Sequence, residues 1–249
     1  MNKVITTLLT AATLLVSASS TAADKLTIAT EGAWAPFNYV DSSGTIKGFD
    51  VDIANALCAE MKVECKIVIN DWDGMIPSLK NRKFDAIVSS MSVTKDRLKQ
   101  VDFTDKYYSG GLRFVAMKGK EFKNDPAALK GKTIGAQRST IASQYLEDEL
   151  GDVVDIKLYD SQEKVYLDAQ SGRLDGFLSD ELPTHAWLQS DKAKNFTFTG
   201  EAFAKDDIIG IAVRKNDKLK GKINKALATI IANGTYAEIN KAYFPFTVY

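Results

Sequence analysis

The sequence predicts an α/β fold made of two similar lobes. Strand-like and helix-like patterns alternate along the chain, which is typical of sheets covered by helices and not of an all-β protein or a helical bundle. The chain also resembles itself in two places. Residues 83–90 (KFDAIVSS) resemble residues 173–180 (RLDGFLSD), and residues 27–31 (TIATE) resemble residues 133–137 (TIGAQ). Because both similarities occur in the same order, we expect two lobes built on one plan.

The spacing of apolar residues places the individual elements. Ile53, Leu57 and Met61 recur every fourth residue and mark one face of a helix that ends near residue 62. We expect Asp50 or Asp52 to cap this helix. Strands are predicted at residues 26–30, 65–69 and 208–213, and helices at residues 73–81, 162–171 and 217–233, with a short last helix after Gly234.

The first 23 residues have the pattern of a secretory signal peptide. Lys3 precedes an apolar run over residues 4–16, and small residues lead to a cleavage point after Ala23. The run is too short to cross a bilayer comfortably, so we favour a cleaved signal over a membrane anchor or a buried N-terminal helix. The mature protein is therefore expected outside the cytoplasm and not inserted in a membrane.

The mature chain has 226 residues, enough for one large domain or two small ones. The full sequence contains 32 basic and 32 acidic residues, and the signal removes one lysine and no acid, so 31 basic residues against 32 acidic ones leave a net charge of −1. Nucleic-acid binding needs a basic footprint. We therefore expect no nucleic-acid partner.

The two cysteines, Cys58 and Cys65, are separated by six residues. In an exported protein such a pair usually forms a disulfide, which would stabilise the fold by about 2.5 kcal/mol in the chain-entropy model. A metal site is the alternative, but it lacks a third soft ligand nearby, and the only histidine is His185. We favour the disulfide and expect no metal site.

Polar residues follow the predicted strands and point to a shared cleft. In open α/β sheets, ligands bind beyond the carboxyl ends of the strands. Two lobes facing each other would place such residues on both sides of one cleft, and the change of lobe is expected near the glycines at residues 109–111. The residues selected by this rule are Glu31, Ser89, Ser90, Gln137, Ser179 and Asp180.

Several longer stretches resemble a known family. Residues 48–58 (GFDVDIANALC), 72–79 (WDGMIPSL) and 85–97 (DAIVSSMSVTKDR) resemble the family 3 solute-binding proteins of ABC transporters. The similarity is greatest to the lysine/arginine/ornithine- and histidine-binding group, which shares the spacing of Cys58 and Cys65. Residues 171–175 (SGRLD) and 210–214 (GIAVR) continue the resemblance, which covers essentially the whole mature chain.

The resemblance implies a type II periplasmic-binding-protein fold, with two α/β lobes joined by a two-strand hinge. After the signal peptide (residues 1–23), lobe 1 would comprise residues 24–111 and a return segment, residues 205–249, with lobe 2 at residues 112–204. It further implies a periplasmic monomer that binds a free amino acid without any cofactor or catalysis and delivers it to a membrane permease.

Two charged residues carry the implied binding role. Arg97 stands where the family grips the α-carboxylate of the ligand, and a guanidinium presents a fork of donors that matches a carboxylate. Asp180 stands where the family pairs the α-ammonium, since a cation that enters a dry cleft needs a counter-charge. The alternatives are a surface arginine and an aspartate that only caps the helix beginning at Glu181.

The remaining predicted contacts are polar loop residues and aromatic side chains. The resemblance makes Ser92 a second carboxylate anchor, Ser90 an acceptor near the α-ammonium and Ser89 a contact of the ligand side chain. Trp34 and Trp72 match positions that sandwich that side chain, and an aromatic face attracts a guanidinium by about 1–2 kcal/mol when desolvated.

Glu31 matches an acidic position that meets a basic ligand tail in the resembling proteins. A carboxylate buried there without a cationic partner would be costly. We therefore predict arginine, lysine or ornithine as the ligand, with arginine-like ligands first. Opines with a basic amino-acid part are an alternative, because two tryptophans suggest a roomy pocket.

The segment from Gln137 to Ala142 departs from the family pattern. Ser139 replaces a glycine, and Ile141 lacks the polar side chain that the family usually has there. Because a helix N-terminus offers backbone amides to a carboxylate, Thr140 and Ile141 are expected to contribute mainly through the main chain. Arg138 is expected to face solvent.

Two functions of other classes remain as alternatives. A few periplasmic proteins of the implied fold are similar to cyclohexadienyl dehydratases, whose chemistry needs a proton donor over the leaving group. His185 lies on a predicted helix outside the cleft, which disfavours this enzyme. The sensing domain of a receptor is the third alternative, but no membrane-spanning segment follows the last predicted helix.

Overall fold

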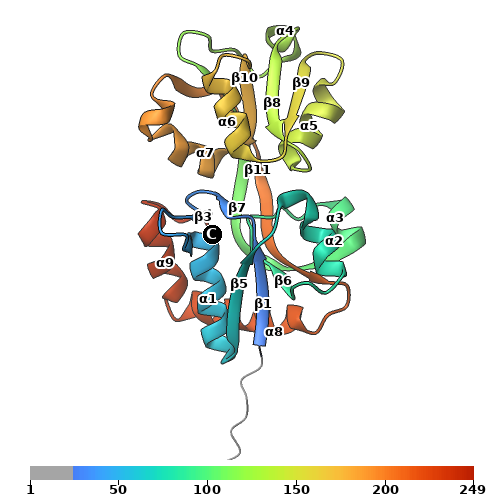
Figure 1. Ribbon diagram of the computed structural model, residues 1–249, viewed down its shortest axis with the longest axis vertical. Helices are drawn as coiled ribbons and strands as arrows, with labels where there is room; N and C mark the ends of the chain where they lie inside the picture. The colour runs from blue at the N-terminus through green and yellow to red at the C-terminus, as the bar shows by residue number, and fades with distance from the viewer. Residues whose placement is uncertain (1–24) are drawn as a thin grey trace, which may run out of the picture.

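The computed structural model describes residues 25–249, so the predicted signal peptide lies outside the described residues. Figure 1 shows two lobes, one above the other, connected by two long strands that run between them. These strands are β7 (Val101–Met117) and β11 (Phe196–Arg214), which pair antiparallel. The predicted fold class is confirmed: two α/β lobes joined by two strands.

A single hydrogen-bonded strand order links both lobes, β5-β1-β6-β11-β7-β10-β8-β9. On one side of the two long strands, the parallel strands of lobe 1 are β5 (Glu64–Ile69), β1 (Lys25–Thr30) and β6 (Ala86–Ile87). On the other side, lobe 2 contains the parallel strands β10 (Gly176–Asp180), β8 (Thr133–Gln137) and β9 (Asp155–Tyr159). The limits at residues 111/112 and 204/205 fall within β7 and β11 and stay a prediction.

Lobe 1 buries an aromatic and aliphatic core between its sheet and its helices. Phe37 and Phe49 are fully buried and stack among the rings of Tyr108 and Phe244. The helices are α1 (Phe49–Met61), α2 (Met75–Lys80), α3 (Lys95–Gln100), α8 (Leu219–Ala232) and α9 (Thr235–Tyr243), with a 3-10 turn at Trp72–Gly74. A small second sheet contains β2 (Ala33–Trp34), β3 (Asn38–Val40) and β4 (Ile46–Lys47).

Lobe 2 has its own cores on the two faces of its sheet. On one face Leu146 and Ile134 are fully buried, and on the other Val165 and Phe177. Its helices are α4 (Pro126–Leu129), α5 (Ile141–Leu150), α6 (Gln162–Gln170) and α7 (Glu181–Leu188), followed by a 3-10 turn at Asp191–Ala193. Each lobe therefore has the separate apolar interior expected of two units that can move about connecting strands.

The predicted elements all occur, with two corrections. The strand predicted at residues 208–213 is the end of the much longer β11, and residues 31–39, after the first predicted strand, contain β2 and part of β3. The predicted cap of α1 is wrong: the helix begins after Gly48 without a side-chain cap. Asp50 instead is fully buried and accepts hydrogen bonds from Asn38 and Tyr107.

The predicted disulfide between Cys58 and Cys65 is present and joins the end of α1 to β5, with a Cα–Cα distance of 6.0 Å. The residues that the structure describes contain no cluster of potential metal ligands. Among residues 25–249, no helix has the length and apolar character needed to cross a membrane.

Candidate functional site

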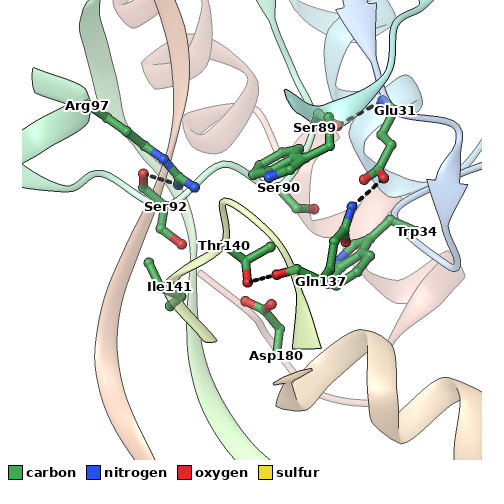
Figure 2. Close-up of a pocket in the computed structure, with 11 residues that line it drawn as sticks. Glu31, Trp34, Ser89, Ser90, Ser92, Arg97, Gln137, Thr140, Ile141 and Asp180 are labelled. Atoms are coloured by element: carbon green, nitrogen blue, oxygen red, sulfur yellow. Dashed lines mark hydrogen bonds between the residues drawn. The ribbon is translucent and has the colours of Figure 1, made fainter. Parts of the chain in front are cut away.

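One pocket between the lobes brings together the residues predicted to bind the ligand, except Ser179, which the strand-end rule also selected and which is buried outside the pocket lining. It holds about 310 Å³ of space free of protein atoms, part of it open to solvent. Lobe 1 lines it with Glu31, Trp34, Trp72, Ser89, Ser90, Ser92 and Arg97, and lobe 2 with Gln137, Thr140, Ile141 and Asp180. Figure 2 shows Arg97 and Glu31 on opposite sides of this pocket.

The position of these residues follows from the sheet topology. Glu31 comes directly after β1, and Ser89 follows β6. In lobe 2, Gln137 ends β8 and Asp180 ends β10. Because each of these strands belongs to a parallel set, their carboxyl ends meet at the same edge, and the two edges face each other across the cleft.

Arg97 is held at one end of the pocket by main-chain groups from both lobes. Its backbone N–H donates to the Thr94 hydroxyl, which caps α3. Its Nη1 donates to Ser92 O at 2.8 Å and its Nη2 to Ser139 O at 2.9 Å. The guanidinium lies 5.3 Å from the ring centre of Trp72. Burial lowers the pKa of Arg97 to about 10, so the group remains a cation at neutral pH.

Asp180 occupies the position before α7, yet its side chain makes no capping hydrogen bond. The carboxylate instead points into the pocket (Figure 2). Burial raises the pKa of Asp180 to about 7, with a further contribution from the charge of Asp207 and an opposing one from Arg97. A buried carboxyl with a raised pKa gains from a cationic partner.

The three serines of the site are each fixed by a hydrogen bond behind the pocket. The Ser89 hydroxyl accepts from Glu31 N at 2.9 Å. The Ser90 hydroxyl donates to Asp50 Oδ2 at 2.9 Å, which leaves its lone pairs free to accept. The Ser92 hydroxyl donates to Asp207 Oδ2 at 2.7 Å. Ser92 can therefore serve a carboxylate through its N–H while this bond is kept.

Glu31 and Gln137 close the other end of the pocket. Gln137 Nε2 donates to Glu31 Oε1 at 2.7 Å across the cleft, and both side chains are buried. Burial raises the pKa of Glu31 to about 7, and the charges of Asp71 and Asp73 raise it further while the bond from Gln137 opposes the shift. A cationic group here would replace a neutral amide as the partner of this carboxylate.

The unusual loop at residues 138–142 keeps the geometry of a helix N-terminus. Ser139 has φ 59°, in the left-handed region that favours glycine, and its carbonyl accepts from Trp72 Nε1 at 3.1 Å. The Thr140 hydroxyl caps α5 by accepting from Ser143 N and is not free for a ligand. The first amides of α5, including that of Ile141, are the groups that a helix start leaves without intrahelical partners.

Comparison with known proteins identifies the family. The model of the bacterial extracellular solute-binding proteins, family 3, matches residues 26–246. The chain belongs to this family. It is 43% identical over 243 residues to the L-arginine-binding protein of Pseudomonas aeruginosa, covering 94% of each chain. It is 38% identical to the lysine/arginine/ornithine-binding periplasmic protein of Escherichia coli, covering 95% of this chain and 94% of the relative.

A solved structure agrees with these relatives. An ancestral arginine-binding protein bound to arginine superposes with a TM-score of 0.85 at 33% identity, covering 90% of this chain and 99% of the other. The family resemblance of the sequence and the type II fold that it implied are thus confirmed.

Within this family 3 protein, Arg138 is exposed to solvent, as expected, and lies at the rim of the cleft. It is half-exposed and forms ion pairs with Asp160 of its own lobe and, at 3.4 Å, with Asp73 of lobe 1. Arg138 therefore bridges the rim of the cleft. Arg138 is not among the residues that line the pocket.

Two carboxylates next to the pocket were missed by the sequence reading. Asp50 holds the Ser90 hydroxyl and accepts from Tyr107 Oη at 2.7 Å. Asp207 on β11 holds Ser92. Asp50 was interpreted as a cap because it stands in the first turn of α1, and Asp207 stands one residue before the apolar run that signalled a strand. His185 is exposed on α7 and does not line the pocket.

Proposed function

We propose that this protein is a periplasmic receptor that captures a basic amino acid, arginine before lysine or ornithine, and delivers it to the permease of an ABC importer. The observation that carries the proposal is the charge pattern of one pocket. A guanidinium (Arg97) stands at one end, a carboxylate (Glu31) at the other, and a second carboxylate (Asp180) lines the wall between the lobes (Figure 2).

This pattern is complementary to the three charges of a basic amino acid. Arg97 and the amides at the start of α5 suit the α-carboxylate. Asp180 and the Ser90 hydroxyl suit the α-ammonium, and Glu31 suits a cationic side chain. A charge left unpaired in such a buried site is costly, so a neutral or acidic side chain beside Glu31 is disfavoured. The names of the arginine- and lysine-binding relatives support the same ligand class.

Contacts between the lobes supply the mechanism of capture. Arg97 and Trp72 of lobe 1 both donate to the Ser139 carbonyl of lobe 2, and Gln137 donates to Glu31 in the opposite direction. Four of the predicted ligand contacts thus take part in hydrogen bonds between the lobes: Arg97, Trp72, Glu31 and Gln137. A ligand favours the closed arrangement through its higher affinity for that state, and closure creates the two-lobe surface that a permease can recognise.

We propose that the protein acts as a monomer and performs no catalysis. A dehydratase of this fold would need a proton donor over the leaving group, and His185 is exposed on α7, away from the pocket. Mixing the protein with prephenate and monitoring aromatic product tests this part. Product formation would establish the enzyme, and its absence together with amino-acid binding supports the receptor.

The experiment that tests the ligand class is calorimetry on the mature protein with a panel of arginine, lysine, ornithine, citrulline, glutamate, leucine and octopine. We expect arginine to bind most tightly and citrulline, which lacks the cationic tail, to bind more weakly. Tight binding of glutamate or leucine without a response to arginine would refute the proposal, and a preference for octopine would replace arginine by an opine.

A further inference from the structure

Asp207 has no part in the proposed function, yet it contacts Ser92 and acts through its charge on Arg97, two residues expected to hold the ligand's α-carboxylate. Its Oδ2 accepts the Ser92 hydroxyl at 2.7 Å. Of the carboxylates that act on Arg97, Asp207 exerts the larger effect, ahead of Asp180, in keeping the guanidinium protonated. Gly110 of β7 pairs with Asp207, and a Cβ at Gly110 would lie 3.7 Å from Oδ2. The carboxylate therefore occupies space between a connecting strand and the pocket.

The segment that carries Ser92 is attached to β11 directly beside Asp207. Val93 N–H donates to Ile208 O at 2.8 Å, and Gly210 N–H donates to Met91 O at 3.2 Å. In this antiparallel arrangement, the N–H and C=O of Ser92, which lies between the two bonds, point away from β11. The Ser92 carbonyl accordingly accepts from Arg97. Asp207 thus takes the hydroxyl of Ser92 and leaves its N–H on the side of the pocket.

We infer that Asp207 is a specificity-determining residue: an internal carboxylate that holds the Ser92 hydroxyl and competes with the ligand's α-carboxylate for the charge of Arg97. The inference rests on the proposed function, in which Arg97 receives that carboxylate. Because like charges near one cation repel, an ionised Asp207 weakens the binding of amino acids relative to ligands whose carboxyl group is blocked. It thereby biases the pocket toward ligands with more positive charge.

The charges around Asp207 make this competition depend on pH. Arg97 from α3, Asp180 from β10 and the phenol of Tyr108 from β7 lie within electrostatic reach. Burial raises the pKa of Asp207 to about 6, opposed by the Ser92 hydrogen bond and by Arg97. A bound carboxylate raises this pKa further. At low pH Asp207 is neutral and does not repel the ligand carboxylate. Once ionised, it repels that carboxylate, so the contribution of Asp207 weakens arginine binding as the pH rises.

The test compares Asp207→Asn with the natural protein, because asparagine can still accept the Ser92 hydrogen bond but has no charge. Calorimetry measures arginine and argininamide, which lacks the carboxylate, at about pH 5 and about pH 7. At the higher pH we expect the variant to bind arginine about three- to tenfold more tightly and argininamide no more tightly. At the lower pH the variant and the natural protein should agree within about twofold.

Two further variants distinguish charge from structure. Asp206→Asn removes a charge from the exposed neighbour on the same strand and should leave the affinity for both ligands unchanged. Asp207→Ala removes the Ser92 partner as well and should weaken both ligands relative to Asp207→Asn. If Asp207→Asn leaves the ratio of the affinities for arginine and argininamide unchanged, or weakens both equally, the inference is overturned. The proposed function still stands in that case, provided that the natural protein binds arginine. Failure of the natural protein to bind arginine overturns both.

Discussion

The two ends of the pocket use opposite electrostatic arrangements. At the carboxylate end, defined by Arg97, Ser92 and Asp180, one guanidinium stands among two carboxylates, because Asp207 lies behind Ser92. At the side-chain end, defined by Glu31, Trp34 and Gln137, one carboxylate accepts from a neutral amide and is flanked by an indole (Figure 2). At the carboxylate end, the cation Arg97 already has more than one carboxylate of the protein nearby. At the side-chain end, the carboxylate of Glu31 has no cation of the protein as its partner in the pocket lining.

This difference separates recognition of the amino-acid backbone from recognition of its side chain. Main-chain carbonyls, Ser92 O and Ser139 O, hold Arg97 at the carboxylate end, and its guanidinium matches the α-carboxylate common to all α-amino acids. The side-chain end depends on the single charge of Glu31. Changes at the carboxylate end should therefore affect all ligands alike, whereas changes at the side-chain end should reorder them.

Replacing Arg97 by alanine should have the largest effect. Removing one partner of a buried charge pair leaves the ligand carboxylate unpaired, which costs about 3–5 kcal/mol. We expect arginine, lysine and citrulline to lose affinity by similar factors in titration calorimetry. Lys99→Ala, an exposed charge on the same helix, is the control and should bind normally. An affinity within about twofold of the natural protein would remove Arg97 from the site.

Replacing Glu31 by glutamine should reorder the ligands. The loss of a charge-assisted contact to the ligand tail should weaken arginine by about 1.5–3 kcal/mol, while citrulline should change by less than about threefold. Competition between the two ligands measures the ratio directly. Glu60→Gln on the exposed face of α1 is the control. Equal losses for arginine and citrulline would show that Glu31 does not read the side chain.

The affinity for arginine should fall as the solution is acidified below neutrality. Burial raises the pKa of Glu31 and of Asp180 to about 7 each, and a bound cation lowers both. Binding therefore releases protons, and below pH 7 the affinity drops by up to about tenfold per pH unit for each group. Calorimetry in buffers of different ionisation enthalpy counts the protons. The affinity for citrulline should depend less steeply on pH, because citrulline has no cationic side chain and pairs only its α-ammonium, with Asp180.

The rule that ligands bind beyond the carboxyl ends of strands predicted part of the pocket lining, whereas Arg97, Ser92, Trp34 and Trp72 were predicted from the resemblance to the family. Glu31, Ser89, Gln137 and Asp180 stand at strand ends, and parallel strands bring such ends to one edge. The Cys58–Cys65 disulfide also depends on neighbours close in sequence. Local spacing was enough for these features.

The sequence was insufficient where a side chain has two plausible local roles and a distant partner decides. Asp50 resembles a helix cap, but Tyr107, 57 residues away, binds its carboxylate in the core. Asp207 meets Ser92, 115 residues away, through the pairing of β11 with the site segment. Arg138 meets Asp73 only because the lobes are apposed. Tertiary contacts of this length leave no periodic signal in the chain.

The ion pair between Arg138 and Asp73 should give the smallest effect, and it tests whether closure is common to both ends. The pair joins the lobes at the rim, and both side chains are about two-fifths exposed (44% and 42%), so it is worth about 0.2–1 kcal/mol. Asp73→Asn should raise the dissociation rates of arginine and citrulline equally, by about 1.5- to 5-fold in stopped-flow measurements. The increase should shrink at high salt. Asp96→Asn, which breaks the Lys99 pair within lobe 1, should leave both rates unchanged. An increase confined to arginine would instead place Asp73 with Glu31 in reading the ligand's cationic tail.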